Sequence, residues 1–406
     1  MPPRRVIFPR LISALAVPAL VLTASACGAP AAQPAEALPT SGPTSGSPSA
    51  PRAPLQVAAF LGEHRIPPAT QYGGTTVGGF SGLDRDPESG TWIVVSDDRS
   101  SLQPARFYTA DLRFDGPDGA LSGVELTATT PLLRPDGTPY PPLDGGDGTT
   151  VDPEDVRIDP ITDQLLWSQE GDRIVPADGT APTLIDPTVR FAGRDGRFGS
   201  ELAVPPEQRA DAGERGIRQN LGPEGLTYAD GGNLIVTALE GPLLQDGPVP
   251  TRTAGALSRI VLQTRTGEVV SEFAYPQEPI FADAVPTDGF ANNGVTAVLA
   301  VDDADPAHFL VVERSFVTGV GNKVRVYEVD TAGATDVAGG QPVSGATPVQ
   351  KRLLVDMADL PLASVDNIEG MAWGPDSADG SRTLVFVSDD NFSETQVTQF
   401  VAVAVR

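Results

Sequence analysis

The sequence predicts an all-β protein whose folded part is a single β-propeller. A unit of two apolar strands joined by a turn, with an acidic residue at its end, occurs five times after residue 54. The chain of 406 residues also contains 43 glycines and 40 prolines, which suit many short strands connected by tight turns. A solitary hairpin cannot bury both of its faces, so the copies must pack on one another. Radial closure achieves this and leaves few exposed strand edges.

The copies lie about 70 residues apart, which is enough for a four-stranded blade with long loops. Each begins with a small or acidic residue, continues with an apolar strand, and turns at Asp, Gly or Pro before its second strand. They span residues 79–99, 152–170, 222–240, 293–314 and 367–390.

The ends of the domain predict how the ring closes. Strand-like stretches at residues 55–60 and 397–405 could pair with each other. We expect about five to seven blades and prefer six, because a degenerate further copy could lie in residues 100–150 or 320–360. A β-sandwich with accidental similarity between its hairpins is the alternative fold.

Residues 1–26 predict a signal peptide. Arginines precede a short apolar run, and small residues come before Cys27. The sequence Ala24-Ser25-Ala26-Cys27 is similar to the motif at which bacterial lipoproteins are cleaved and lipidated, and Cys27 is the only cysteine of the chain. We therefore expect an exported lipoprotein of the cell envelope. Cleavage after Ala26 without lipidation, which would give a freely secreted protein, is the alternative.

Composition separates a linker from the propeller domain and narrows the partners. Residues 27–54 consist mostly of Ala, Pro, Ser, Gly and Thr, which is typical of a disordered linker, and residues 55–406 form the propeller. The formal net charge of −25 repels nucleic-acid phosphates and anionic lipid headgroups. We expect no nucleic-acid partner, contact with a membrane only through a lipid on Cys27, and a monomer.

Acidic residues recur at corresponding places in the copies and predict a metal site. The start of one antiparallel strand lies beside the end of the next, so acids at both places should meet at one end of the channel. Carboxylates that lie close together raise each other's pKa or bind a cation. Ca²⁺ fits such a site because it takes six to eight oxygen ligands in irregular geometry. The candidate ligands are Asp97, Asp98, Glu154, Glu170, Glu224, Glu240, Glu313, Glu369, Asp389 and Asp390.

Three arginines that directly follow acids, Arg99, Arg173 and Arg314, are candidate substrate-binding residues. A guanidinium can hold a phosphate or carboxylate through two parallel hydrogen bonds. Together with a cation, these groups would bind a small anionic ester, polarise it and lower the pKa of a bound water. The candidate catalytic residues are Glu224, Glu369 and Asp389. The alternative is that the acids cap turns and each arginine pairs with its neighbouring acid.

The same segments resemble the phytase-like family of secreted bacterial proteins, which is named for the esterase-like activity of phytase. The resemblance rests on residues 78–83, 95–99, 152–155, 222–226, 312–314, 367–371 and 387–392. It implies hydrolysis of phosphoesters with calcium, by analogy with propeller phytases that surround inositol hexakisphosphate with lysines and arginines. Lys323 and Lys351 are the only lysines here, so a smaller phosphoester or another ester is expected in place of phytate.

Three functions stay open at this point. The first is a calcium-dependent hydrolase of phosphoesters or related esters. The second is a calcium-dependent propeller lactonase, which the segment Pro223-Glu224-Gly225 would also fit. The third is a non-enzymatic binding module, stabilised by calcium, whose loops recognise a partner at the cell envelope.

Overall fold

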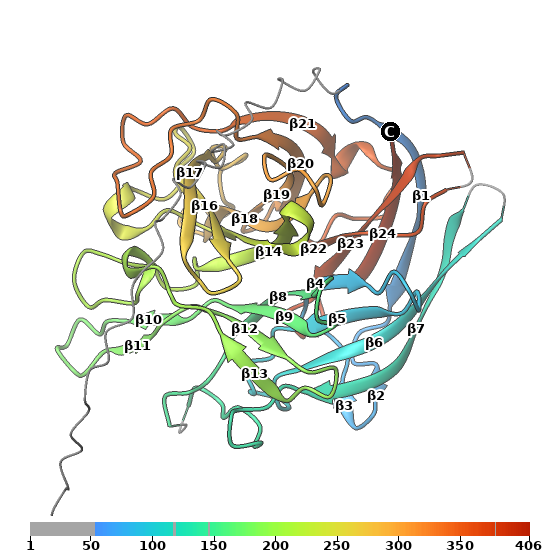
Figure 1. The fold of residues 1–406 in the computed structure, drawn as a ribbon, viewed down its shortest axis with the longest axis horizontal. Helices are drawn as coiled ribbons and strands as arrows, with labels where there is room; N and C mark the ends of the chain where they lie inside the picture. Colours follow the sequence, from blue (N-terminus) through green and yellow to red (C-terminus); the bar gives the residue numbers. More distant parts are fainter. Residues whose placement is uncertain (1–52, 117–118, 145–146, 378) are drawn as a thin grey trace, which may run out of the picture. The chain divides into compact units, whose positions relative to one another are not determined.

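The computed structural model describes residues 53–116, 119–144, 147–377 and 379–406 (Figure 1). The predicted signal peptide, Cys27 and all but the last two residues of the predicted linker lie outside these residues. Within the described residues, no helix has the length and apolar composition needed to cross a membrane. The predicted all-β propeller is confirmed.

Five four-stranded sheets surround the propeller axis, and each sheet is one blade (Figure 1). Blade 1 contains β4 (Phe80–Arg85), β5 (Trp92–Ser96), β6 (Arg106–Asp115) and β7 (Ala120–Pro131). Blade 2 contains β8 (Pro153–Ile158), β9 (Leu165–Gln169), β12 (Thr188–Ala192) and β13 (Phe198–Glu201). Blade 3 contains β14 (Pro223–Ala229), β15 (Leu234–Leu239), β16 (Leu257–Thr264) and β17 (Val269–Pro276). Blade 4 contains β18 (Ala291–Ala300), β19 (His308–Val317), β20 (Gly321–Asp330) and β21 (Gln350–Asp356).

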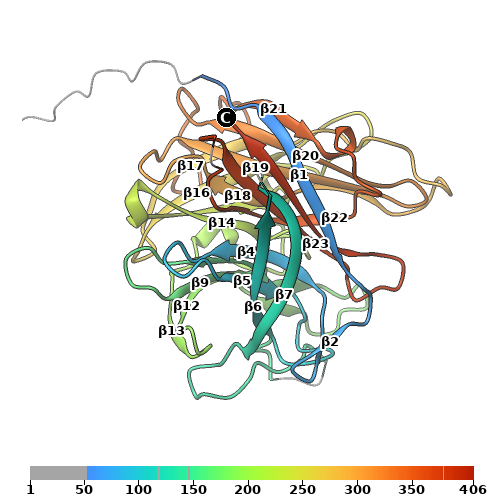
Figure 2. The same cartoon turned by 90° about the vertical axis from the view of Figure 1, so that its right-hand side faces the viewer.

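Blade 5 combines the two ends of the domain, as predicted. It contains β22 (Asn367–Trp373), β23 (Arg382–Asp389), β24 (Thr398–Val405) and, as its outermost strand, β1 (Val57–Ile66) (Figure 2). Strand β1 pairs antiparallel with β24 from Val57 opposite Val405 to Ile66 opposite Thr398. Because the last blade takes its outer strand from the start of the domain, main-chain hydrogen bonds hold the ring closed.

The preferred number of six blades is wrong, although five lies within the predicted range. Residues 100–150 contain β6 and β7, and residues 320–360 contain β20 and β21, so both regions supply outer strands of blades that were already recognised. The recurring sequence unit covers only the two inner strands of each blade. The remaining elements are small: the hairpins β2 (Gln71–Tyr72) with β3 (Thr75–Thr76) and β10 (Asp172–Ile174) with β11 (Thr183–Ile185), and the 3-10 turns η1 (Pro206–Gln208), η2 (Asp230–Gly232), η3 (Leu244–Asp246) and η4 (Met357–Asp359).

Apolar side chains fill each of the five interfaces between neighbouring blades. The interface of blades 5 and 1, for example, contains Phe80, Tyr108 and Phe400, whose rings meet edge to face. The other four interfaces hold similar buried clusters. Burial of apolar surface between blades therefore stabilises the ring.

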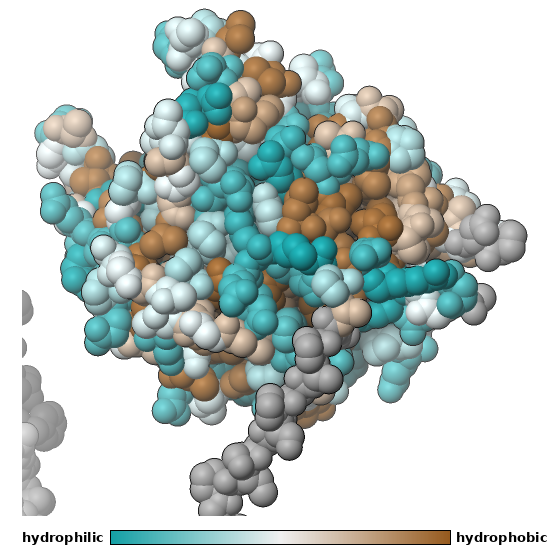
Figure 3. Space-filling model, turned by 90° about the horizontal axis from the view of Figure 1, so that it is seen from above, coloured by the Kyte–Doolittle hydropathy of each residue, from teal (hydrophilic) through white to brown (hydrophobic). Residues whose placement is uncertain are grey.

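The side of the propeller that carries β21 and β1 mixes hydrophilic side chains with an apolar patch (Figure 3).

The innermost strands β4, β8, β14, β18 and β22 contact one another around the axis, and a buried arginine joins them. The Arg157 guanidinium donates hydrogen bonds to the carboxylate of Asp155, at 2.9 Å, in its own strand. It also donates to one main-chain carbonyl oxygen in each of the other four inner strands, those of Leu83, Leu226, Val298 and Met371. Burial raises the pKa of Asp155 to about 7, although Arg157 opposes the shift. This pair connects all five blades.

Replacing Arg157 with Gln should destabilise the propeller by about 3–5 kcal/mol, because it leaves Asp155 buried without its partner. Urea denaturation followed by tryptophan fluorescence would measure the loss. The matched control is Arg113→Gln, since Arg113 forms an ion pair with Glu125 while both side chains are more than half exposed. That change should cost less than about 1 kcal/mol. Equal losses for the two variants would contradict a special role for Arg157.

Candidate metal and substrate site

A β-bulge at the same place in all five inner strands aims one side chain of each strand into the channel. Pairing with the second strand shifts by one residue there, for example between Pro223 and Gly225 of β14. A bulge bends the strand and turns the extra residue away from the ladder. We call these residues the bulge ring; its members are Ser81, Glu154, Glu224, Thr296 and Glu369.

The two members of the bulge ring that carry hydroxyls support the acids of the next blade. Ser81 donates a hydrogen bond to the carbonyl oxygen of Pro153, at 3.2 Å, and Thr296 donates to that of Ile368, at 3.1 Å. Each acceptor directly precedes a glutamate of the bulge ring. The hydroxyls therefore hold the main chain from which Glu154 and Glu369 project.

A second set of side chains comes from the ends of the second strands. Each of these residues lies opposite the residue two positions before the bulge ring, as Glu240 does by donating its N–H to the Gly222 carbonyl at 2.7 Å. We call this set the strand-end ring; its members are Asp97, Glu170, Glu240, Arg314 and Asp389. In blade 4 the ring position thus holds an arginine in place of an acid.

Glycines opposite the strand-end ring make room for its carboxylates. A Cβ atom on Gly222 would lie 2.7 Å from Cγ of Glu170, and one on Gly294 would lie 2.5 Å from Cγ of Glu240. Both acids belong to the preceding blade, so they cross over the inner strand of the next one. The recurring glycine of the sequence unit is therefore a condition for bringing acids from neighbouring blades together.

Three members of each ring border a cavity of about 510 Å³ at one end of the channel. Its polar lining includes Asp97, Asp152, Glu154, Glu224, Glu369 and Asp389, with Arg99 and Arg314. Two groups of acids place one oxygen per residue within 4.8 Å of one another. The first group is Asp152, Glu154 and Glu170, and the second is Glu170, Glu224 and Glu240. Glu170 belongs to both groups.

The acids of the cavity are buried close to like charges, and both effects favour their neutral form. Burial first, and then neighbouring carboxylates, raise the pKa of Glu154, Glu170 and Glu224 well above the ordinary value. The pKa of Asp152 and that of Glu240 rise only to about 7, because an arginine opposes the effect of burial. Binding of a cation would remove the same repulsion.

Arg99 and Arg314 line the cavity. Neither arginine forms its ion pairs with the acid that directly precedes it in the sequence. Arg99 contacts Asp152 at 3.2 Å and Asp172 at 2.7 Å. Arg314 contacts Glu240 at 3.3 Å and Glu369 at 3.1 Å. Burial alone would lower the pKa of Arg314, but these two glutamates raise it above its usual value. The two arginines are resident cations of the acidic site.

Seven of the ten predicted ligands lie together in these rings, and three do not. Asp98 accepts hydrogen bonds from Arg106 and from main-chain N–H groups of residues 101–103. Asp390 accepts from the Gly79 N–H and the Thr398 hydroxyl. Glu313 accepts from the Tyr275 hydroxyl and from Lys351. All three side chains stabilise loops or outer strands, so the prediction that they belong to the ring of acids is wrong.

The error at Glu313 has a simple cause. Side chains alternate between the two faces of a strand, so a shift of one residue exchanges the faces. The register pairs Glu313 with Val295 and Arg314 with Gly294, which puts Arg314 at the ring position. Arg173 is also misplaced, because it donates to the carbonyl oxygens of Asp211 and Gly213, at 2.7 Å each, and does not line the cavity.

Sequence reasoning missed Asp152 as a site residue, although it stood in a recognised segment. Its place two residues before Glu154 corresponds to that of Asn367 before Glu369, and this correspondence was the available signal. The remaining wall is formed by amides and two aromatic residues: Asn220, Asn292, Asn322, Asn391, Gln396, Phe290 and Phe316. Of these, Asn391 alone stood in a recognised segment of the sequence, residues 387–392.

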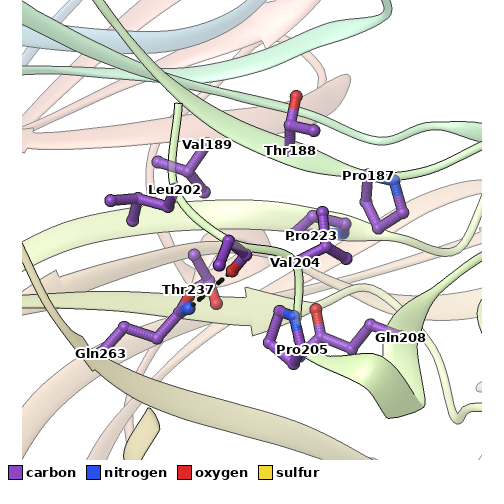
Figure 4. Close-up of a pocket in the computed structure, with 11 residues that line it drawn as sticks. Pro187, Thr188, Val189, Leu202, Val204, Pro205, Gln208, Pro223, Thr237 and Gln263 are labelled. Atoms are coloured by element: carbon purple, nitrogen blue, oxygen red, sulfur yellow. Dashed lines mark hydrogen bonds between the residues drawn. The ribbon is translucent and has the colours of Figure 1, made fainter. Parts of the chain in front are cut away.

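A second cavity lies between blades 2 and 3 and offers no comparable chemistry (Figure 4). Its volume is about 10 Å³, room for a single water molecule. Prolines, valines and Leu202 line it together with Thr188, Thr237 and two glutamines. Gln263 donates a hydrogen bond across it to the Ala203 carbonyl, at 3.1 Å. No ionisable side chain borders this space.

Fold and cavity define a class of protein: a five-bladed propeller whose inner strands project carboxylates and arginines into one end of the channel. The chain belongs to the phytase-like family, described as esterase-like activity of phytase, whose model matches residues 75–392. This match confirms the predicted family. It includes all five inner strands and every member of both rings.

Comparison with solved structures finds similar chains at low identity. A gluconolactonase from Xanthomonas campestris has a TM-score of 0.30 and 9% identity, over 87% of this chain and 99% of that one. A duf4221 family member from Bacteroides vulgatus has a TM-score of 0.33 and 9% identity, over 87% and 98%. The Dos1 propeller has a TM-score of 0.29 and 10% identity, over 79% and 66%. A search of curated proteins finds no match.

Proposed function

We propose that the protein is a calcium-dependent hydrolase of small phosphoesters or related esters that acts outside the cytoplasm. The observation that carries the proposal is the presence of two groups of three acidic residues each, which have Glu170 in common. Two oxygens that each lie about 2.4 Å from one cation can be no more than about 4.8 Å apart. The separations between the carboxylate oxygens meet that limit in both groups.

The chemistry of the donors supports calcium among the common metals. Every member of the two groups is a carboxylate, and hard oxygen donors suit Ca²⁺ better than Zn²⁺, which prefers nitrogen and sulfur. Asp152, Glu154 and Glu170 would hold one ion, and Glu170 with Glu224 and Glu240 a second. When bound, calcium would polarise the ester and lower the pKa of a nearby water.

The remaining groups of the cavity would bind and orient the substrate. Arg314 and Arg99 carry N–H donors at the cavity wall and could hold an anionic oxygen while their contacts with acids fix their positions. Glu369 and Asp389 line the cavity outside both carboxylate groups, so they could exchange a proton with the ester. Glu224 is better placed to hold the cation.

Replacing Glu224 with Gln should weaken calcium affinity by at least about tenfold, because it removes a charged ligand. Isothermal titration of the purified propeller domain with Ca²⁺ would measure the change. The matched control is Glu328→Gln, since Glu328 lies on the outer strand β20 and pairs with Arg352. Equal effects at both positions would contradict a metal site built by the rings.

Turnover provides the test of the enzymatic part of the proposal. The purified domain should hydrolyse a generic phosphomonoester, and a calcium chelator should abolish that activity. The panel should include phytate and several lactones, because preferential turnover of a lactone would replace the proposed reaction by that of a lactonase. A melting temperature that falls with the chelator, without turnover of any substrate, would favour a calcium-stabilised binding module.

We also infer that the protein is exported and held at the cell envelope by a lipid on Cys27. The motif Ala24-Ser25-Ala26-Cys27 after an apolar segment supports this location. Replacing Cys27 with Ser should move the protein from the membrane fraction to the soluble fraction of cells that express the full chain. An unchanged distribution would contradict lipidation at this cysteine.

A further inference from the structure

One wall of the acidic cavity is apolar. Phe290 and Phe316 both line the cavity, with ring centroids 6.3 Å apart and ring planes inclined by 32°. Phe290 is 65% exposed, and the nearby Val285 and Val320 are 65% and 48% exposed. The Val285 N–H donates a hydrogen bond to the carbonyl oxygen of Thr318, which lies in the same turn as Val320. An exposed apolar surface therefore continues outward from the cavity wall.

The main chain holds this aromatic pair in place. Phe316 lies on β19 directly opposite Asn292 of β18, and its N–H donates to Oδ1 of Asn292 at 3.2 Å. The Phe290 carbonyl accepts the Thr318 N–H at 2.9 Å, which extends the pairing of the two strands. The aromatic side chains of Phe290 and Phe316 thus project from hydrogen-bonded main chain and form an ordered apolar surface next to the cavity.

The position of the pair relative to Arg314 indicates what it would contact. Arg314 and Phe316 are two residues apart on β19, so their side chains leave the same face of the strand about 7 Å apart. Arg314 Nη1 also donates to Oδ1 of Asn292, at 3.2 Å, so the arginine and the Phe316 N–H share one amide oxygen. Arg314 is buried among ring acids, whereas Phe290 is largely exposed to solvent.

We propose that the cavity selects esters with an aryl or alkyl substituent, which packs on Phe290 and Phe316 while the anionic group lies at Arg314. This inference rests on the proposed function, because it assumes that the cavity binds an anionic ester. Burying an apolar substituent on this wall would stabilise the complex, whereas a phosphate or a sugar hydroxyl there would lose water without gaining a hydrogen bond. A uniformly charged ligand such as phytate would leave the apolar wall unused.

Equilibrium binding separates this inference from catalysis. Phenylphosphonate and methylphosphonate carry the same anionic group and cannot be hydrolysed as esters, so isothermal titration in the presence of calcium compares their substituents alone. The intact chain should bind phenylphosphonate more tightly by roughly tenfold or more. Phe290→Ala should remove most of that preference and leave methylphosphonate affinity unchanged. Because Phe290 is largely exposed, the variant should fold normally.

The matched control is Ile161→Ala, which removes a similarly exposed apolar side chain at the β8–β9 turn, the other end of that hairpin from the acids. This variant should keep the full preference for phenylphosphonate. Equal binding of the two phosphonates by the intact chain, or an unchanged preference in Phe290→Ala, would overturn the inference. So would failure of both phosphonates to bind. None of these results would contradict the proposed function unless the calcium-dependent turnover assay also failed.

Discussion

The hydrogen bonds of Arg157 on the propeller axis determine how closely the five inner strands can approach one another. Its guanidinium donates to carbonyl oxygens of four strands and to Asp155 of its own, so each blade contributes an acceptor to one buried cation. Asp155 in turn accepts the Leu226 N–H of the next blade, at 2.9 Å. The bulge ring lies directly beside this layer in every inner strand. The spacing of its carboxylates therefore depends on the same contacts that join the blades.

Gathering so many carboxylates at one end of a channel works against stability, and the structure contains several features that offset the repulsion. Glycines such as Gly222 and Gly294 allow acids of one blade to cross the next without a clash. Arg314 occupies one ring position, and Arg99 contacts Asp152 from outside the rings. The five apolar interfaces supply the stabilisation that such a site requires. Functional sites commonly hold groups that reduce stability in this way.

The sequence pattern predicted the propeller and its closure because period-two strands, turn residues and a repeated acid are local features. It did not predict five blades, since only the inner hairpin of each blade carries the repeated unit and the outer strands have ordinary composition. The site was predicted where copies align without a gap, as at Glu154, Glu224 and Glu369. The prediction failed at Glu313, because a shift of one residue in the strand register decides which face of the sheet a side chain lies on. Arg157, Phe290 and Phe316 were missed because their importance depends on contacts between blades or strands that no local pattern records.

The departures from five-fold symmetry divide the cavity into two sides with different chemistry. Blades 2 and 3 supply both carboxylate groups that could share cations, through Asp152, Glu154, Glu170, Glu224 and Glu240. Blade 4 contributes no acid to either ring, since its two positions hold Thr296 and Arg314, and it also supplies the aromatic pair. A symmetric ring of acids would bind cations at the axis and leave no preferred direction for a substrate. Because Arg314 and the apolar wall lie on the blade 4 side of the cavity, the proposed anionic ester would approach the proposed cations in one orientation. A hydrolase needs such an asymmetry, whereas a purely structural calcium site does not.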